Sequence, residues 1–232
     1  AAEWVERHAK LASAGSDAAL RAVIARFEGD PAEVLQLLRA SREAGDDDWD
    51  AEQRGWLALS CWQAGDLECA QAALAAGLAE LDGGVDGIAL FDDADDHRRA
   101  ALLGFVALRL GDTRGEPLLR TVLASLRQIP MDSVGQSLER PLPEAELLAA
   151  LGDEAGALAA LEAALPGDGE SVRLRTIAGT SPERSPYFDQ LKDHPRFQTI
   201  MAEFERRRRA VTEPDAAVRD EWSSPLPEER AQ

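Results

Sequence analysis

The chain has little cysteine, little tyrosine and no long apolar run. Two of its 232 residues are cysteine and one is tyrosine. No apolar run approaches the ~18 residues that a membrane-spanning helix needs, so the sequence predicts no membrane span. The chain also begins at Ala1 without a methionine, which indicates a segment of a longer polypeptide. The hydrophobic share of 45% and the charged share of 29% are ordinary for a folded globular domain.

Cationic residues are scarce as well. The chain has 25 lysines and arginines against 43 aspartates and glutamates, which gives a formal net charge of −18. Such a balance repels a phosphate backbone, so nucleic acid is excluded as a partner of this segment.

Cys61 and Cys69 are too few to form a disulfide framework. The favoured interpretation is that both are free buried thiols that pack as small apolar residues, rather than a bridge or a pair of metal ligands. The cysteine count therefore does not determine the cellular compartment, and the cytoplasm is favoured over the periplasm.

Strand patterns are nearly absent, and helical patterns dominate. Apolar residues recur three and four positions apart, as at Leu147, Leu148 and Leu151, and the residues around them are mostly helix formers. The sequence therefore predicts an all-α fold.

A Gly-Asp dipeptide recurs between helical patterns. It begins at Gly29, Gly65, Gly111 and Gly152, so successive copies lie 36, 46 and 41 residues apart. The glycine suits the left-handed residue that ends one helix, and the aspartate suits the N-cap of the next. In the third copy, Glu116 is followed by a proline, which predicts a shifted start of the second helix.

Small residues stand seven positions before each of these glycines, at Ala22, Ala58, Gly104 and Ala145. This layout resembles the tetratricopeptide-repeat (TPR) family, whose paired antiparallel helices pack closely through small residues. The second copy, residues 51–82, matches best, although Cys61 stands where a tyrosine is usual and Gly77 where an alanine is usual. The resemblance covers roughly residues 18–165 and implies an α-solenoid, a right-handed superhelix of helix pairs; an unrelated helical-hairpin repeat is the alternative.

Residues 185–198 read Ser-Pro-Tyr-Phe-Asp-Gln-Leu-Lys-Asp-His-Pro-Arg-Phe-Gln. They resemble a closing motif that follows TPR arrays in many bacterial multidomain proteins. The motif predicts a C-terminal capping helix with Asp193 as its N-cap and Pro195 in its first turn. Its apolar stripe is expected to cover the last repeat, through Phe197, Met201 and Phe204. We therefore expect about four repeats and the capping helix in residues 1–211, followed by a flexible acidic tail in residues 212–232.

No motif of catalysis or metal binding is found. His8, His97 and His194 lie far apart, and the glycine-rich residues 83–87 follow no strand. The acidic clusters at 46–48 and 92–96 lack the order of a calcium loop and suit helix N-termini. Four arginines at 206–209 complement a helix C-terminus better than they form an anion-binding patch. The sequence thus predicts no catalytic residue, no metal and no cofactor.

In the TPR family, the first helix of each pair lines a concave groove. The resemblance implies that a peptide-binding groove here is lined by Arg26, Phe27, Glu52, Leu59, Trp62, Gln63, Arg98, Phe105 and Arg109. It also places Ala101, Leu108, Glu146, Ala149 and Ala150 on this face. The alternative for its centre is that Phe105 only packs between repeats and that Arg109 pairs with a neighbouring carboxylate.

The leading interpretation is a non-catalytic protein–protein interaction module, the interaction or sensor part of a larger bacterial regulatory or signalling protein. Its partner would be a protein or peptide that carries a carboxylate, and a homo-oligomer is also allowed. The alternatives are an enzyme or small-ligand-binding helical domain with an unrecognised pocket, and a structural spacer between other domains.

Overall fold

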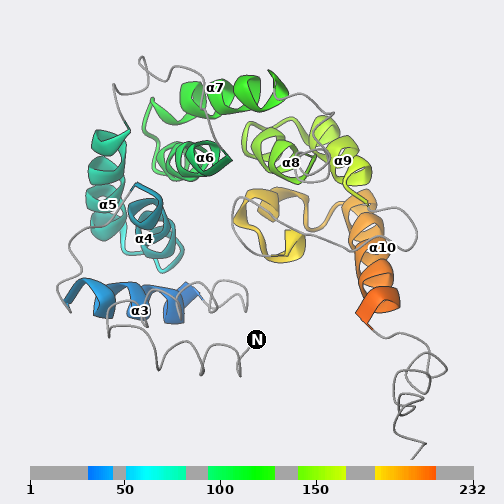
Figure 1. Ribbon diagram of the computed structural model, residues 1–232, viewed down its shortest axis with the longest axis horizontal. Coiled ribbons are helices and arrows are strands. Elements are labelled where there is room, and N and C mark those ends of the chain that lie inside the picture. The colour runs from blue at the N-terminus through cyan, green and yellow to red at the C-terminus, as the bar shows by residue number, and fades with distance from the viewer. Residues whose placement is uncertain (1–30, 44–50, 82–93, 129–140, 166–180, 213–232) are drawn as a thin grey trace, which may run out of the picture.

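The computed structural model describes residues 31–43, 51–81, 94–128, 141–165 and 181–212 (Figure 1). Within these ranges every regular element is a helix, which confirms the all-α prediction. The elements are α3 (Pro31–Glu43), α4 (Ala51–Gln63), α5 (Leu67–Glu80), α6 (Ala94–Arg109), α7 (Gly115–Gln128), α8 (Pro141–Ala150), α9 (Glu154–Ala163), the 3-10 segments η2 (Pro182–Arg184) and η3 (Pro186–Leu191), and α10 (Pro195–Thr212). The first Gly-Asp turn, the glycine-rich residues 83–87 and the tail beyond Thr212 lie outside the described residues.

Three of the four expected Gly-Asp turns are confirmed. Gly65, Gly111 and Gly152 have φ values of 77°, 74° and 80°, a region that glycine enters without steric cost. After the first and third of these glycines, the aspartate caps the next helix. Asp66 accepts the Cys69 amide at 3.1 Å, and Asp153 accepts an amide three residues on at 2.9 Å.

The second of these turns is longer, as its proline predicted. The next helix starts four residues after Gly111, at Gly115, whereas α5 and α9 start two residues after their glycines. Asp112 accepts both the backbone amide and the guanidinium of Arg114. These hydrogen bonds lower the pKa of the Asp112 carboxyl to about 2.

The helices pair in antiparallel hairpins. An ion pair between Arg54 and Glu80 joins the start of α4 to the end of α5. In the next pair, His97 Nε2 lies 3.0 Å from Ser125 Oγ, which joins the start of α6 to the end of α7. Helices α8 and α9 form the third packed pair, with only the Gly152-Asp153 turn region between them.

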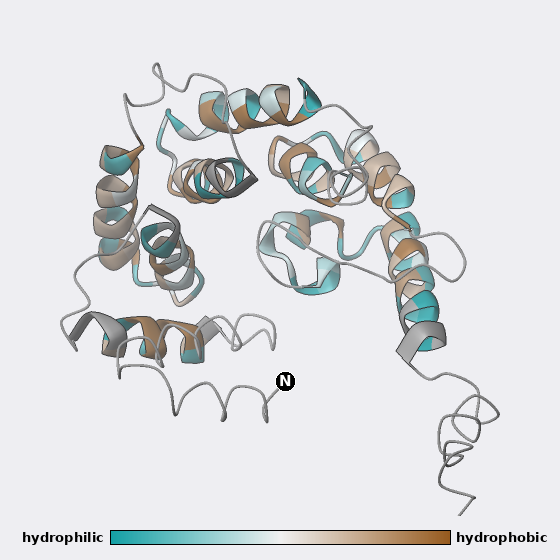
Figure 2. Cartoon of the chain, viewed as in Figure 1, coloured by the Kyte–Doolittle hydropathy of each residue, from teal (hydrophilic) through white to brown (hydrophobic). Residues whose placement is uncertain are grey.

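Successive pairs pack side by side along an arc (Figure 1). Helices α4, α6 and α8 follow its inner side, and α5, α7 and α9 its outer side. Helix α3 packs against α4 at one end, and α10 packs against α9 at the other. In Figure 2 the ribbon of α7 is coloured hydrophobic along the side nearest α6. The buried residues of α7 include Leu118, Leu119, Val122, Leu123 and Leu126.

Two glycines let α6 approach the preceding pair closely. A Cβ at Gly55 would lie 2.9 Å from Leu102 Cδ2, and one at Gly77 would lie 2.7 Å from Leu103 Cδ2. Both leucines are fully buried. The departure from alanine at Gly77 thus has a packing cause: an alanine methyl there would collide with Leu103.

Ala58 tests the packing between helices. It is fully buried in α4, so Ala58→Leu should lower the free energy of unfolding by about 1–3 kcal/mol through overpacking. Ala72→Leu on the exposed side of α5 is the matched control and should change stability by less than about 0.5 kcal/mol. Urea denaturation followed by circular dichroism measures both, and equal stability of the two variants would contradict the packing register.

The closing helix begins one residue later than a cap at Asp193 implies. Helix α10 starts at Pro195, as expected for a first-turn proline, but its cap is His194 and not Asp193. The His194 carbonyl accepts the amide of Gln198, and its Nδ1 accepts the amide of Arg196 at 3.1 Å. The predicted apolar stripe is confirmed, since Phe197, Met201 and Phe204 are all buried.

Candidate functional site

An arginine and two aromatic rings meet where α4 and α6 lie together. Trp62 stands in the last turn of α4, and Phe105 and Arg109 stand one turn apart on α6. The two rings meet edge to face, with centroids 5.9 Å apart. The Arg109 guanidinium carbon lies 5.0 Å from the Phe105 centroid and 5.8 Å from the Trp62 centroid. These distances are within the range of cation–π attraction. We call these three residues the Arg109 cluster.

Tyr187 packs against the Arg109 cluster through Phe105. Its ring stacks on Phe105 with centroids 4.1 Å apart, and its hydroxyl donates to the carbonyl oxygen of Ala101 at 3.1 Å. Burial raises the pKa of the Tyr187 phenol well above its usual value, and the charge of Glu146 acts in the same direction. The phenol therefore stays protonated and keeps its donor.

The rest of the same segment binds α8. Ser185 Oγ donates to Glu146 Oε1 at 2.6 Å, and both side chains are fully buried. Gln190 Nε2 donates to the carbonyl oxygen of Ala149. In Figure 1 this segment lies inside the arc next to α8. Residues 185–191, which we call the closing segment, thus cover the inner side of α6 and α8 at Ala101, Phe105, Glu146 and Ala149.

The predicted groove residues do not form one continuous exposed surface in the described part of the chain. Trp62, Phe105 and Arg109 are brought together, but Phe105 is fully buried between Trp62 and Tyr187. Leu59 is also buried, whereas Gln63 is exposed at the end of α4. Arg98 is half-buried two turns before Phe105. Glu52 lies in the first turn of α4, and Arg26 and Phe27 lie outside the described residues.

Sequence reasoning missed the closing segment as part of the inner face. The motif predicts a cap over the last repeat, and Glu146 and Ala149 carry no sign of function in the sequence. The signal that could have indicated the contact is the lone tyrosine of the chain, placed beside Phe188 in a segment otherwise rich in polar residues. A buried tyrosine needs a partner for its hydroxyl, and Ala101 supplies it from 86 positions away.

Arg109 differs from the other exposed arginines around it. Within the described ranges its contacts are with two rings, and no ion pair holds it. Other exposed arginines pair with carboxylates at 2.6–2.8 Å, as do Arg39, Arg114, Arg120, Arg127 and Arg196. The alternative expectation that Arg109 pairs with a neighbouring carboxylate finds no such partner among the described residues.

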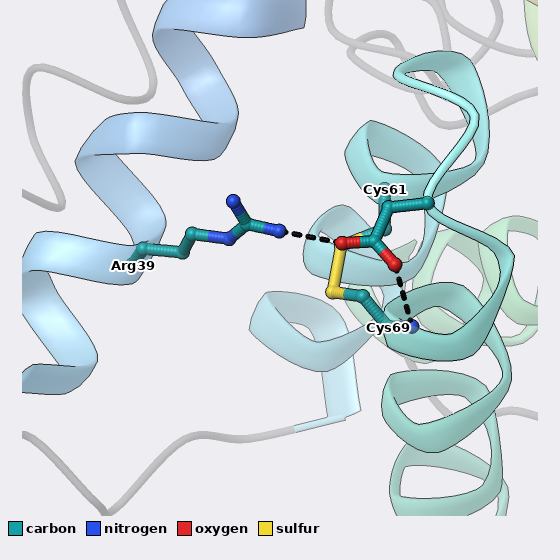
Figure 3. The surroundings of a disulfide bond; sticks show 4 residues. Arg39, Cys61 and Cys69 are labelled. Atoms are coloured by element: carbon teal, nitrogen blue, oxygen red, sulfur yellow. Dashed lines mark hydrogen bonds and ion pairs between the residues drawn. A yellow bond between two sulfur atoms is a disulfide. The ribbon is translucent and has the colours of Figure 1, made fainter.

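The expectation of two free thiols is wrong. Cys61 and Cys69 form a disulfide, with Cα atoms 5.8 Å apart (Figure 3). The spacing of eight places one cysteine in the last turn of α4 and the other in the first turn of α5. The Gly65-Asp66 turn then reverses the chain between them, which brings the two residues within bonding distance.

Three of the four arginines at 206–209 pair with glutamates of the same helix, α10. Arg206 and Arg207 both pair with Glu203, and Arg209 pairs with Glu205. The hydrogen bonds from Arg206 and Arg207 lower the pKa of the Glu203 carboxyl to about 2. These intrahelical pairs occupy the guanidinium groups of Arg206, Arg207 and Arg209, which argues against an anion-binding patch there.

The described residues gather no group of three or more histidine, cysteine, aspartate or glutamate side chains suited to a metal ion. In the same part of the chain, no helix combines the length and apolar character that crossing a membrane requires.

Comparisons with protein-family models, with curated proteins and with solved structures find no match to this chain. The resemblance to the TPR family therefore stays a prediction from the residues and spacings of the sequence.

Proposed function

We propose that the chain is a non-catalytic interaction module, a TPR-like α-solenoid within a larger bacterial regulatory or signalling protein. In this proposal a partner peptide binds on the inner face at the Arg109 cluster. The packed antiparallel pairs and the arc of inner helices α4, α6 and α8 support it.

The exposed guanidinium of Arg109 is the observation that carries this proposal. A cation stacked over ring faces keeps its N–H groups at the edge of its plane, where a carboxylate can accept two of them. Among the described residues, the exposed Arg39, Arg114, Arg120, Arg127 and Arg196 pair with carboxylates, whereas Arg109 lies over two rings. Arginine and tryptophan side by side are also the residue types that dominate binding hot spots. The partner chemistry that fits is a peptide with at least one carboxylate.

A structural spacer is the second candidate, because one observation favours it. The closing segment buries Ala101, Phe105, Glu146 and Ala149, which narrows the inner surface left for a partner. A spacer would need no exposed arginine held over aromatic rings, and this difference separates the two candidates.

Selection of peptides on the full chain tests the proposal. A random peptide library is selected against the immobilised protein, and the affinities of the enriched peptides are measured by isothermal titration. We expect carboxylate-bearing peptides whose Kd rises by about tenfold or more with Arg109→Ala, equivalent to about 1.4 kcal/mol.

The matched control is Arg120→Ala, because Arg120 is an exposed arginine on the outer helix α7 that pairs with Glu116. Binding by this variant should equal that of the parent, and the affinity of both should fall with added salt. Peptides that bind Arg109→Ala as tightly as the parent, or a selection that enriches nothing, would contradict the proposal and favour the spacer.

A further inference from the structure

The turn between α4 and α5 is covalently closed. Cys61 is fully buried in the last turn of α4, and Cys69 is partly exposed in the first turn of α5. Their disulfide spans the Gly65-Asp66 turn with a sequence separation of 8 (Figure 3). The bond therefore acts on one helix pair only.

The other two helix pairs make the same turn without a cross-link. Four positions before and after the turn glycine, they carry Ala107 with Gly115 and Leu148 with Gly156. Their turns nevertheless share the positive φ of the glycine, with values of 74° and 80° against 77° at Gly65. They also share the backbone hydrogen bond that the aspartate amide donates to the residue five positions earlier, at 2.9 Å in each turn. The helix hairpin thus forms without a disulfide in the other two pairs. The cross-link is a feature of the α4–α5 pair and is not required for the turn.

This cross-linked turn touches two neighbouring parts of the fold. On one side, Asp66 accepts the Cys69 amide and pairs with Arg39 of α3 at 2.7 Å, as Figure 3 shows. On the other side, Trp62 follows Cys61 directly and contacts both Phe105 and Arg109. If this turn becomes less ordered, both the contact with α3 and the position of Trp62 in the Arg109 cluster are therefore affected.

We propose that the Cys61–Cys69 disulfide is a reversible redox latch on the α4–α5 turn, and that its reduction weakens peptide binding at the Arg109 cluster. The second half of this statement rests on the proposed function. The turns of the other pairs show that the hairpin persists without the bond, so its loss loosens the turn without unfolding the array.

The reductant is a thiol such as glutathione. Its thiolate attacks the sulfur of Cys69, which belongs to the more exposed of the two residues, and forms a mixed disulfide while Cys61 leaves as a thiolate and takes up a proton. A second glutathione thiolate then attacks the mixed disulfide, so that oxidised glutathione is released and Cys69 becomes a thiol. Two electrons and two protons pass to the protein, and two glutathione molecules are oxidised to one disulfide.

Hydrogen exchange of the full chain tests the latch without any peptide. The protein is equilibrated in glutathione buffers from fully oxidised to mostly reduced, and free thiols are counted by alkylation and mass spectrometry. We expect two thiols to appear in mostly reduced buffer. Amides of residues 61–69 should then exchange about tenfold faster or more, because opening a short loop is no longer restrained by the bond. Residues 148–156, the equivalent turn of the third pair, should exchange at an unchanged rate.

The double variant Cys61→Ala with Cys69→Ala is the control, because Ala107 occupies the position equivalent to Cys61 in the next pair. It should exchange like the reduced parent and should not respond to glutathione. A bond that persists in mostly reduced glutathione, or exchange rates that do not change on reduction, would overturn the latch.

Peptides selected on the oxidised chain then test the link to the site. We expect their Kd to rise by about threefold or more on reduction, with no redox response in the double variant. Equal affinity in both states would overturn the link while the proposed function stands. A chain that binds no peptide in either state would contradict the proposed function. The hydrogen-exchange experiment would still test whether the disulfide is a reversible redox latch.

Discussion

Replacing Tyr187 with alanine is expected to lower the free energy of unfolding by about 3–5 kcal/mol. The ring is fully buried, stacks on Phe105 with centroids 4.1 Å apart and sends its hydroxyl to Ala101. Its removal leaves a cavity between α6 and the closing segment. Urea denaturation followed by circular dichroism measures the loss, with the disulfide kept oxidised in all samples.

Two variants calibrate this result. Tyr187→Phe keeps the ring and loses only the hydrogen bond to Ala101, so it should cost about 1 kcal/mol. Lys192→Ala changes an exposed residue that follows η3 and should alter stability by less than about 0.5 kcal/mol. If Tyr187→Ala unfolds at the same urea concentration as Lys192→Ala, the closing segment is not part of the core.

The second large effect is expected from Ser185→Ala, which should lower the free energy of unfolding by about 2–3 kcal/mol. Ser185 Oγ donates to the fully buried Glu146 carboxylate at 2.6 Å and also accepts the Tyr187 amide. Loss of the donor leaves a fully buried acceptor without this partner, which costs more than loss of an exposed hydrogen bond because water cannot replace it.

A double-mutant cycle isolates this interaction. In a Glu146→Leu background no buried carboxylate remains, so Ser185→Ala should cost only about 1 kcal/mol, the cost of losing the amide contact of Tyr187. The same cost in both backgrounds would show that the pair of Ser185 and Glu146 contributes nothing of its own.

The turns could be predicted from sequence because their causes are local. A glycine that ends a helix acts locally and is found at all three described turns, and the following aspartate caps the next helix at two of them. The later start of α7 followed from the same local chemistry. The cap of α10 was misplaced by one residue because Asp193 and His194 can both accept an amide at a helix start, and propensity favours aspartate.

Contacts between distant residues could not be predicted. Tyr187 meets Ala101 across 86 positions, and no periodicity in either segment specifies that pairing. The expectation of free thiols was wrong for a different reason. The predicted Gly65-Asp66 turn lies midway between Cys61 and Cys69, so a disulfide was compatible with the sequence, but two cysteines are too few to indicate a disulfide framework by their number. Of the candidate site, the TPR resemblance assigned Phe105 and Arg109 to the same groove, and the structure brings the two side chains together, but the resemblance gave no sign that Tyr187 covers Phe105.

The central claim is that a peptide binds on the inner face at the Arg109 cluster, and the hydrogen-exchange footprint of a selected peptide tests it most directly. The oxidised full chain is compared with and without saturating peptide. The account predicts slower exchange at the end of α4 and the end of α6, around Trp62 and Arg109, and unchanged exchange in the outer helices α5, α7 and α9. Protection confined to the outer helices would contradict it.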